Sequence, residues 1–184
     1  TFDLSGWRLV GVDFVFPPGT LLGPNRYAVV TRNRDAFAAA YGFGVLPVGE
    51  YPGALQNDGE RLRLVRPGVP PEPDLVVDEV RYENVAPWPT RADGTGASLQ
   101  LIDARRDNWC VGNWAAATPG ANVQTTPGAA NSVAALLDSF PLVFLNEVQP
   151  RNLTGRADRF GERDPWIELH NAGSSSVALA GLYL

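Results

Sequence analysis

The sequence predicts an all-β sandwich with one or two short helices, and three observations favour this fold class. Short apolar or alternating segments recur along the chain, separated by clusters rich in glycine, proline and asparagine. The counts of Gly 19 and Pro 16 are high for a helical protein and suit strands joined by tight turns. Apolar residues make up 45% of the chain, which is enough to form a folded core.

The first part of the chain predicts two strands and a helix. Residues 7–16 are apolar and β-branched, and Pro17-Pro18-Gly19 ends this strand as a turn. Residues 26–31 predict a second strand. Residues 34–41 contain four alanines and no helix breaker, so they predict a short helix that Gly42 closes.

The middle of the chain predicts a hairpin turn and a half-buried strand. Asp-Gly tolerates positive φ, so Asn57-Asp58-Gly59-Glu60 indicates a turn between two strands. Directly after it, Leu62 and Leu64 alternate with Arg61 and Arg63. This alternation predicts a strand with one apolar and one charged face.

A further alternating strand is predicted over residues 75–82, and a short one over 98–102. Strict alternation over 75–82 separates two sets of side chains. One face carries Val76, Asp78, Val80 and Tyr82, and the other carries Val77, Glu79 and Arg81.

The last third begins with a stretch that predicts little regular structure. Residues 103–131 are rich in Gly, Pro and Asn, and residues 133–140 predict a helical linker that ends before Pro141. Strands are predicted over 142–149, 166–170 and 177–184. The middle one of these three has Trp166, Glu168 and His170 on one face and Ile167 and Leu169 on the other.

Composition also bears on partners. The formal net charge is −5, and all 15 basic residues are arginine. An acidic chain is a poor partner for nucleic acid or an anionic membrane, so neither is expected. The arginines on the predicted strand that contains Leu62 are expected to form a solvent-exposed face of that strand.

No apolar run approaches the length of about 18 residues that a membrane span needs. Cys110 is the single cysteine, so no internal disulfide can form.

The two ends of the chain carry the same short pattern. Such a match predicts one period of a tandem repeat, cut inside a module and taken from a longer polypeptide. The match joins Leu4, Gly6 and Leu9 to Leu179, Gly181 and Leu184.

Several segments together resemble the lamin tail domain family, in permuted order. Leu145-Asn146-Glu147-Val148 and Trp166-Ile167-Glu168-Leu169-His170-Asn171 are similar to the opening strands of that family. Leu4-Ser5-Gly6-Trp7, Pro18-Gly19-Thr20 and Tyr27-Ala28-Val29-Val30 are similar to its next strands and turn. Later signatures of bacterial members resemble Asn57-Asp58-Gly59-Glu60, Val77-Asp78, Trp88-Pro89, Asp93-Gly94-Thr95-Gly96-Ala97-Ser98-Leu99 and Pro127-Gly128-Ala129-Ala130-Asn131.

The resemblance implies an immunoglobulin-like β-sandwich and a division of the chain. Residues 1–131 would be a domain body that lacks its first strands, 132–141 a linker, and 142–184 the opening strands of the next copy. The last segment would complete a sandwich within its own chain or in a neighbour, and the second case would give a strand-swapped homodimer. Residues 3–9 and 178–184 would compete for one strand position, and 3–9 is expected to occupy it because Trp7 is the larger apolar group.

An acidic segment is the main candidate for a metal site. Hard cations such as Ca²⁺ prefer several oxygen ligands from one short segment, and the alternative function is therefore a calcium-dependent binding or hydrolytic domain. Arginines at 156, 159 and 163 interrupt the segment, so a charge-balanced loop is favoured instead. The carboxylates are Asp158, Glu162, Asp164 and Glu168.

Two other groups of residues are candidates for chemistry or binding. A Cys110–His170 dyad is formally conceivable, but Cys110 lies between Trp109 and Val111 and is expected in or near the core. Trp7 and Trp166 lie in strand patterns and are expected in the core. Trp88, Trp109 and Trp114 lie in predicted loops, so they are the candidate surface for a carbohydrate or peptide.

The favoured function is a non-catalytic interaction or structural module of a larger secreted or cell-surface bacterial protein. The predicted repeat and the resemblance both support this interpretation, which requires no enzyme activity and no cofactor. Its expected partners are neighbouring copies of the module, other proteins, or the substrate of an enzyme on the same polypeptide.

Overall fold

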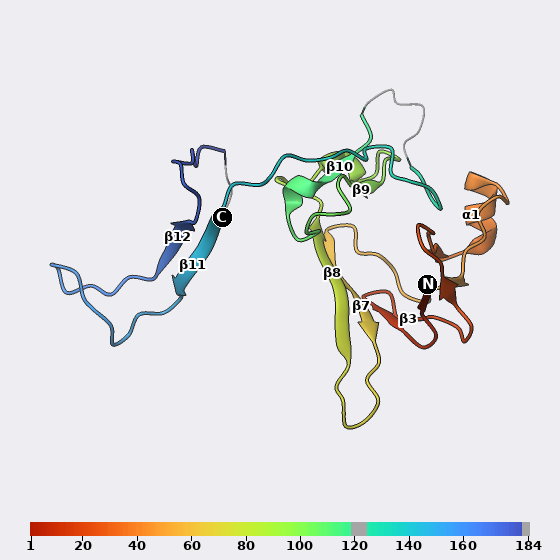
Figure 1. The fold of residues 1–184 in the computed structure, drawn as a ribbon, viewed down its shortest axis with the longest axis horizontal. Coiled ribbons are helices and arrows are strands. Elements are labelled where there is room, and N and C mark those ends of the chain that lie inside the picture. The colour runs from red at the N-terminus through yellow and green to blue at the C-terminus, as the bar shows by residue number, and fades with distance from the viewer. Residues whose placement is uncertain (119–124, 182–184) are drawn as a thin grey trace. The chain divides into compact units, whose positions relative to one another are not determined.

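The computed structural model describes residues 1–118 and 125–181. The chain divides into two units, Thr1–Leu137 and Asp138–Leu184, here called unit 1 and unit 2. The regular structure of the described residues is mainly short strands in several antiparallel sheets, with one α-helix (Figure 1). The prediction of a β-rich fold is confirmed, whereas the sandwich arrangement stays a prediction.

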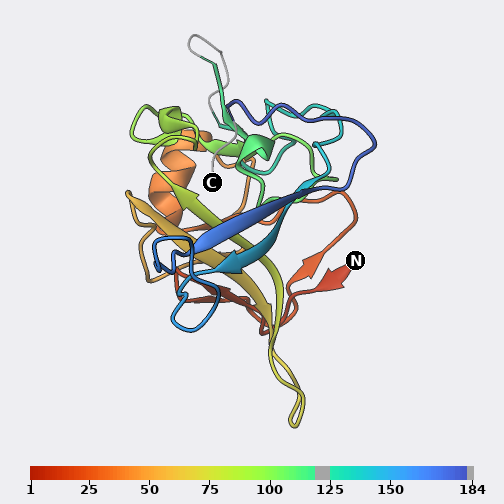
Figure 2. The same ribbon diagram turned by 90° about the vertical axis from the view of Figure 1, so that its left-hand side faces the viewer.

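The main sheet of unit 1 consists, in the described residues, of four antiparallel strands in the order β3-β2-β7-β8. Figure 2 shows β7 and β8 running side by side as the longest pair of the unit. The strands are β2 (Arg8–Val10), β3 (Phe14–Val15), β7 (Gly59–Arg66) and β8 (Leu75–Glu83).

The prediction of one strand over 7–16 is wrong, because the segment folds into the β2–β3 hairpin. Gly11 adopts φ 116° and Asp13 φ 57°, so the backbone turns here. Glycine tolerates this region and aspartate is among the few side chains that enter it at modest cost. The pair is a turn signal inside an otherwise apolar run.

The other strands of unit 1 are short pairs around the main sheet. β1 and β4 are antiparallel, β5 and β6 are parallel, and β9 and β10 are antiparallel. Of two short 3₁₀ helices, Thr90–Ala92 comes before β9, and Val111–Asn113 lies between β9 and β10. The bounds are β1 (Phe2–Asp3), β4 (Leu21–Leu22), β5 (Val30–Thr31), β6 (Gly49–Glu50), β9 (Leu99–Leu101) and β10 (Trp114–Ala116).

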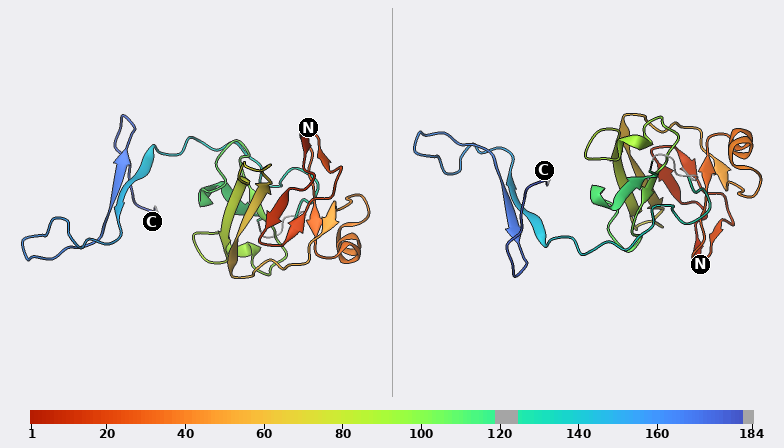
Figure 3. Two further views of the ribbon diagram at one scale, coloured as in Figure 1. Left: turned by 90° about the horizontal axis from the view of Figure 1, so that it is seen from below. Right: turned by 90° about the horizontal axis from the view of Figure 1, so that it is seen from above.

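The predicted helix is confirmed as α1 (Arg34–Tyr41). The Asn33 side chain accepts a hydrogen bond from the Ala36 amide at 2.7 Å, which satisfies a free N–H of the first turn. Gly42 ends the helix with φ 77°, as its position in the sequence predicts. In the views of Figure 3, α1 lies at the end of unit 1 away from β8.

Two other expectations for unit 1 are wrong. Asn57-Asp58-Gly59-Glu60 does not join two paired strands, because the preceding strand β6 pairs with β5 and Gly59 instead begins β7. Within 26–31 only Val30–Thr31 is a strand. The stretch 103–131 is mostly irregular in its described residues, as predicted, and it also contains β10, whose Trp114 pairs with Leu101.

The hydrophobic core lies on one face of the main sheet. Phe14 and Phe16 pack edge to face with ring centroids 5.0 Å apart. Leu9, Leu62 and Leu64 pack against this cluster and remain partly exposed. The buried members are Leu4, Trp7, Val12, Phe14 and Phe16, so the prediction of a core position for Trp7 is confirmed.

Residues 3–9 therefore belong to unit 1. The Gly6 amide donates to the Phe16 carbonyl at 3.0 Å, and the Leu4 amide donates to the Thr20 carbonyl at 2.8 Å. The competition with 178–184 for one strand position stays a prediction, and residues 182–184 of that segment lie outside the described residues.

A buried amide organises the loop between β9 and β10. Asn113 is fully buried, its Oδ1 accepts from the Asp103 amide at 2.9 Å, and its Nδ2 donates to the Asp103 carbonyl at 3.0 Å. The same Nδ2 donates to the Asp107 carbonyl at 3.3 Å. This one side chain thus satisfies backbone N–H and C=O groups of the loop that would otherwise be buried without a hydrogen-bond partner.

The segment before residue 138 is held in unit 1 by hydrogen bonds, and the prediction of a helix over 133–140 is wrong. The Ala135 amide donates to the Ile102 carbonyl at 3.0 Å, and the Leu137 amide donates to the Asp103 carboxylate at 3.1 Å. The Arg106 guanidinium donates to the Leu137 carbonyl at 3.0 Å. These contacts use the backbone groups that a helix needs, so tertiary contacts override the local helical preference.

Replacing Asp103 with Asn is expected to reduce the dependence of stability on acid pH. Hydrogen bonds from Arg105 and the Leu137 amide lower the pKa of the buried Asp103 carboxyl. Its contribution is therefore complete above the ordinary carboxyl pKa of about 3.9 and is lost as the pH falls toward the folded value. Urea unfolding of both proteins from about pH 2 to 7 measures this; parallel pH profiles would contradict the assignment.

Unit 2 contains one antiparallel pair in its described residues, β11 (Val143–Gln149) and β12 (Trp166–Asn171). Both strands lie within one residue of their predicted bounds at each end. Residues 177–181 do not form the expected strand, and 182–184 are outside the described residues. We call the pair the β11–β12 hairpin, although a long loop joins its strands.

Candidate functional site

Unit 1 carries an open apolar cavity over the main sheet, which we call the apolar groove. The pairing of Leu9 with Leu64 places both on the same face, and Leu62 follows by the two-residue period of β7. These leucines form the floor of a cavity of about 460 Å³. Its apolar lining includes Phe2, Leu9, Leu62, Leu64, Val77 and Val80.

The rim of the groove is formed on one side by β8, which is an edge of the main sheet as far as the described strands show. A bulge between Asp78 and Val76 makes Val77 an extra residue in β8. Val76 pairs with Val65 and so faces away from Asp78, and Val77 lines the groove. The prediction that Val76 shares a face with Asp78 and Val80 is wrong, because the bulge resets the alternation.

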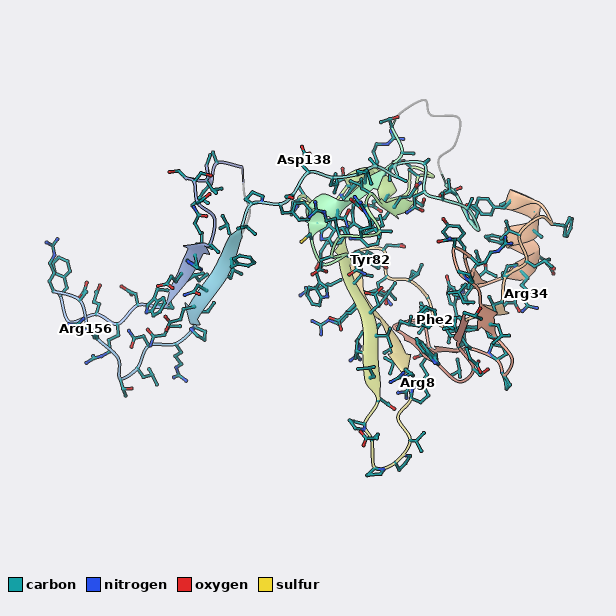
Figure 4. All side chains as sticks on the ribbon, viewed as in Figure 1. Phe2, Arg8, Arg34, Tyr82, Asp138 and Arg156 are labelled. Carbon is teal, nitrogen blue, oxygen red and sulfur yellow. The ribbon has the colours of Figure 1, made fainter. Side chains whose placement is uncertain are left out.

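The opposite rim comes from the first residues of the chain. Phe2 pairs with Leu22 through β1 and β4, and both residues line the groove. Figure 4 labels Phe2 on this side of unit 1. Phe2 is 66% exposed and Val77 is 45% exposed, so large apolar side chains on both rims contact water.

Unit 2 carries a second apolar surface, whose faces are set by the β11–β12 register. Leu145 pairs with Leu169 and Val148 with Ile167, and these four share one face with Val143. The other face is mixed. It consists of Phe144, Glu147, Gln149, Trp166, Glu168 and His170.

A bulge at Asn146 places the apolar residues of β11 on one face of the hairpin. Leu145 and Val148 are three residues apart, so strict alternation would place them on opposite faces. The extra residue between Leu145 and Glu147 returns both to the same face. The Asn146 side chain donates to the Glu168 carboxylate, which holds the bulge against the polar face.

The apolar face of the hairpin is open to solvent. Leu145 is 62% exposed, Val148 and Ile167 are each 53% exposed, and Leu169 is 38% exposed. An isolated pair of strands is at best marginally stable in water and needs a covering layer. A contiguous apolar face of this kind indicates an interaction surface.

Two of the three candidate tryptophans, Trp88 and Trp114, lie close together. The rings of Trp88 and Trp114 lie 6.0 Å apart at 48°, and the Trp114 indole N–H donates to the Asn108 carbonyl at 2.7 Å. Trp114 also lines a second cavity of about 420 Å³, together with Tyr82. Trp109 is 55% exposed, and Trp166, expected in the core, is 40% exposed on the mixed face of the hairpin.

The acidic segment forms local turns. Asp158 Oδ1 accepts from the Phe160 and Glu162 amides at 2.8 and 3.0 Å, and the Glu168 carboxylate accepts from the Asn146 side-chain amide. Across residues 1–118 and 125–181, no group of three or more His, Cys, Asp or Glu side chains could hold a metal ion. Asp158, Glu162, Asp164 and Glu168 are therefore not brought together as a cation site in this part of the chain.

The two members of the conceivable dyad lie in different units, Cys110 in unit 1 and His170 in unit 2. Cys110 is exposed, so its expected core position is wrong. Partial burial of its thiol and the Asp107 carboxylate raise its pKa, which disfavours the nucleophilic thiolate.

The sequence pattern identifies the segments of the candidate site and misses both bulges. The amphipathic pattern of 166–170 is confirmed by the register. The three-residue spacing of Leu145 and Val148 is the available signal for the first bulge. No comparable signal marks Val77, because Val76 and Val77 are chemically alike.

No helix among the described residues combines the length and apolar character needed to cross a membrane. Comparison of the chain with protein-family models, with curated proteins and with solved structures found no match.

Proposed function

We propose that the chain is a non-catalytic protein-interaction module of a larger secreted or cell-surface bacterial protein, and that the apolar groove takes up an apolar β-segment. The observation that supports this most is the groove itself. It combines a leucine floor, a cavity of about 460 Å³ and exposed apolar rims. Burying such an apolar surface against another protein segment stabilises the complex, and this requires no catalytic side chain.

The proposal includes the lamin-tail-like, immunoglobulin-like sandwich that the sequence resembles. A sheet with one apolar face reaches a stable arrangement by packing that face against a second layer. The main sheet of unit 1 supplies one layer through Leu9, Leu62 and Leu64. In our proposal the bound segment supplies part of the other layer.

The repeated Leu-x-Gly-x-x-Leu pattern at the two ends of the chain supports a parent protein built from several such modules. In that setting the module would hold neighbouring copies or other surface proteins together. No cofactor is part of this proposal.

Peptide binding to the full-length protein with the substitution Val148→Asp tests the proposal. The substitution places a charge on the apolar face of the β11–β12 hairpin, so this face does not compete with the peptide for the groove. The residues of the groove are unchanged. The probe is a fluorescent extended peptide of about ten residues in which valine alternates with threonine and glutamate. Saturable binding, followed by anisotropy, is expected.

Adding Val77→Arg to that protein should weaken peptide binding at least about tenfold, since the change places a charge in an apolar contact. Adding Val76→Arg is the matched control, because Val76 is equally exposed at 45% but belongs to the opposite face. Absence of binding, or equal loss with both arginines, would refute the proposed function.

A further inference from the structure

The groove in unit 1 and the apolar face of the hairpin in unit 2 are complementary in kind. The groove presents the face of a sheet with Leu62 and Leu64 on its floor. The hairpin presents a pair of strands with Val148 and Ile167 on the same face. Both surfaces belong to every copy of the chain, so each copy carries a receptor and a ligand.

We propose that the β11–β12 hairpin of one chain covers the apolar groove of a second copy. This inference rests on the proposed function and names its partner. Five apolar side chains of the hairpin, Val143, Leu145, Val148, Ile167 and Leu169, would be removed from water against the groove. Face-to-face packing of this kind gives the second layer of a β-sandwich.

The connection between the units favours a second copy over the same chain. The segment is anchored in unit 1 up to Leu137 by Asp103 and Arg106, and Figure 4 labels the next residue, Asp138. Only residues 138–142 separate this anchor from β11. Five residues span at most about 18 Å, and a residue before proline, here Phe140, favours an extended conformation.

A short, stiff connection of this kind promotes exchange between chains, because folding back requires a reversal within few residues. The contact between groove and hairpin is heterologous, since different surfaces meet. Reciprocal exchange between two chains then closes a two-fold dimer, whereas successive exchange extends a chain of copies.

Light scattering behind size exclusion over a concentration series tests the inference on the full chain. The unsubstituted chain is expected to form dimers or a concentration-dependent series of larger species. Val148→Asp and Val77→Arg should each weaken self-association at least about tenfold. The matched controls are Phe144→Asp, equally exposed at 53% on the other face of the hairpin, and Val76→Arg. Both controls should assemble like the unsubstituted chain.

Mixing the two defective proteins tests the pairing directly. Val77→Arg retains an intact hairpin and Val148→Asp retains an intact groove, so the mixture can form one sound contact. A heterodimer from two monomeric variants is the expected result. Circular dichroism of each variant verifies its fold, which both exposed sites are expected to preserve.

Lengthening the connection provides a second measurement. About ten Gly and Ser residues inserted after Asp138 would let the hairpin reach its own groove, so the protein should shift to a monomer. Persistence of the dimer would overturn the argument from the connection.

The inference would be overturned if the unsubstituted chain is monomeric at every concentration, or if the mixture of Val77→Arg and Val148→Asp does not assemble. The proposed function would still stand if the peptide binds the groove of Val148→Asp. Loss of peptide binding with intact dimers would instead refute the proposed function and require another contact for the dimer.

Discussion

Asn113→Ala should lower the free energy of unfolding by roughly 2–5 kcal/mol. The substitution leaves the Asp103 amide and carbonyl without their partner in a buried position. Each unsatisfied buried backbone group costs about 1–3 kcal/mol. Denaturant unfolding measures the loss, and hydrogen exchange should show faster exchange of the Asp103 amide.

Two other substitutions distinguish the loss of hydrogen bonds at Asn113 from the loss of its side-chain volume and from the effect of removing an exposed asparagine. Asn113→Asp preserves the volume and one acceptor but removes the amide donor, so it should also destabilise, since the Asp103 and Asp107 carbonyls would face a carboxylate. Asn57→Ala is the matched control at an exposed turn position and should change stability by no more than about 0.5 kcal/mol. A cost below about 1 kcal/mol for Asn113→Ala would show that the loop does not depend on this side chain.

Phe14→Ala should destabilise the protein by about 3–5 kcal/mol, because it opens a cavity in the core of unit 1. Phe14 is 5% exposed and packs against Phe16. Phe43→Ala, at a residue that is 83% exposed, is the matched control and should have little effect. Thermal and denaturant unfolding of the three proteins measure the difference.

Gly49 provides a stricter test of the same contact. A Cβ atom at Gly49 would lie 2.5 Å from Cε2 of Phe14, so Gly49→Ala alone should cost about 1–3 kcal/mol. In the Phe14→Ala background the ring is gone, and the same change should cost much less. The double-mutant cycle should therefore show coupling above about 1 kcal/mol, and additive effects would contradict the packing described for Phe14.

The sequence predicts correctly those elements whose local signals agree with their final environment. Helix α1 has a capping side chain, an alanine-rich interior and a terminal Gly42, and it forms as predicted. Residues 133–140 have similar local preferences, but their backbone bonds to Ile102 and Asp103. Contacts between segments so distant in sequence cannot be derived from a local pattern.

Faces of strands are predictable only where alternation is uninterrupted. Residues 166–170 have strict alternation, and the register confirms both faces. In β8 and β11 one extra residue shifts the alternation, so strict alternation assigns Val76 and Val77 to the wrong faces. The groove depends on the shift in β8 and on pairing between β2 and β7, which lie about 50 residues apart in the chain.

The Asn146 bulge has a consequence for how this protein tolerates deletions. Removing Asn146 would give β11 and β12 an unbroken ladder, which favours the pair locally. The same deletion would leave Leu145 and Val148 two residues apart, so both would remain on the side of Ile167 and Leu169. β11 can therefore lose this one residue without exchanging its two faces, whereas a one-residue deletion inside the regular strand β12 would move side chains to the opposite face.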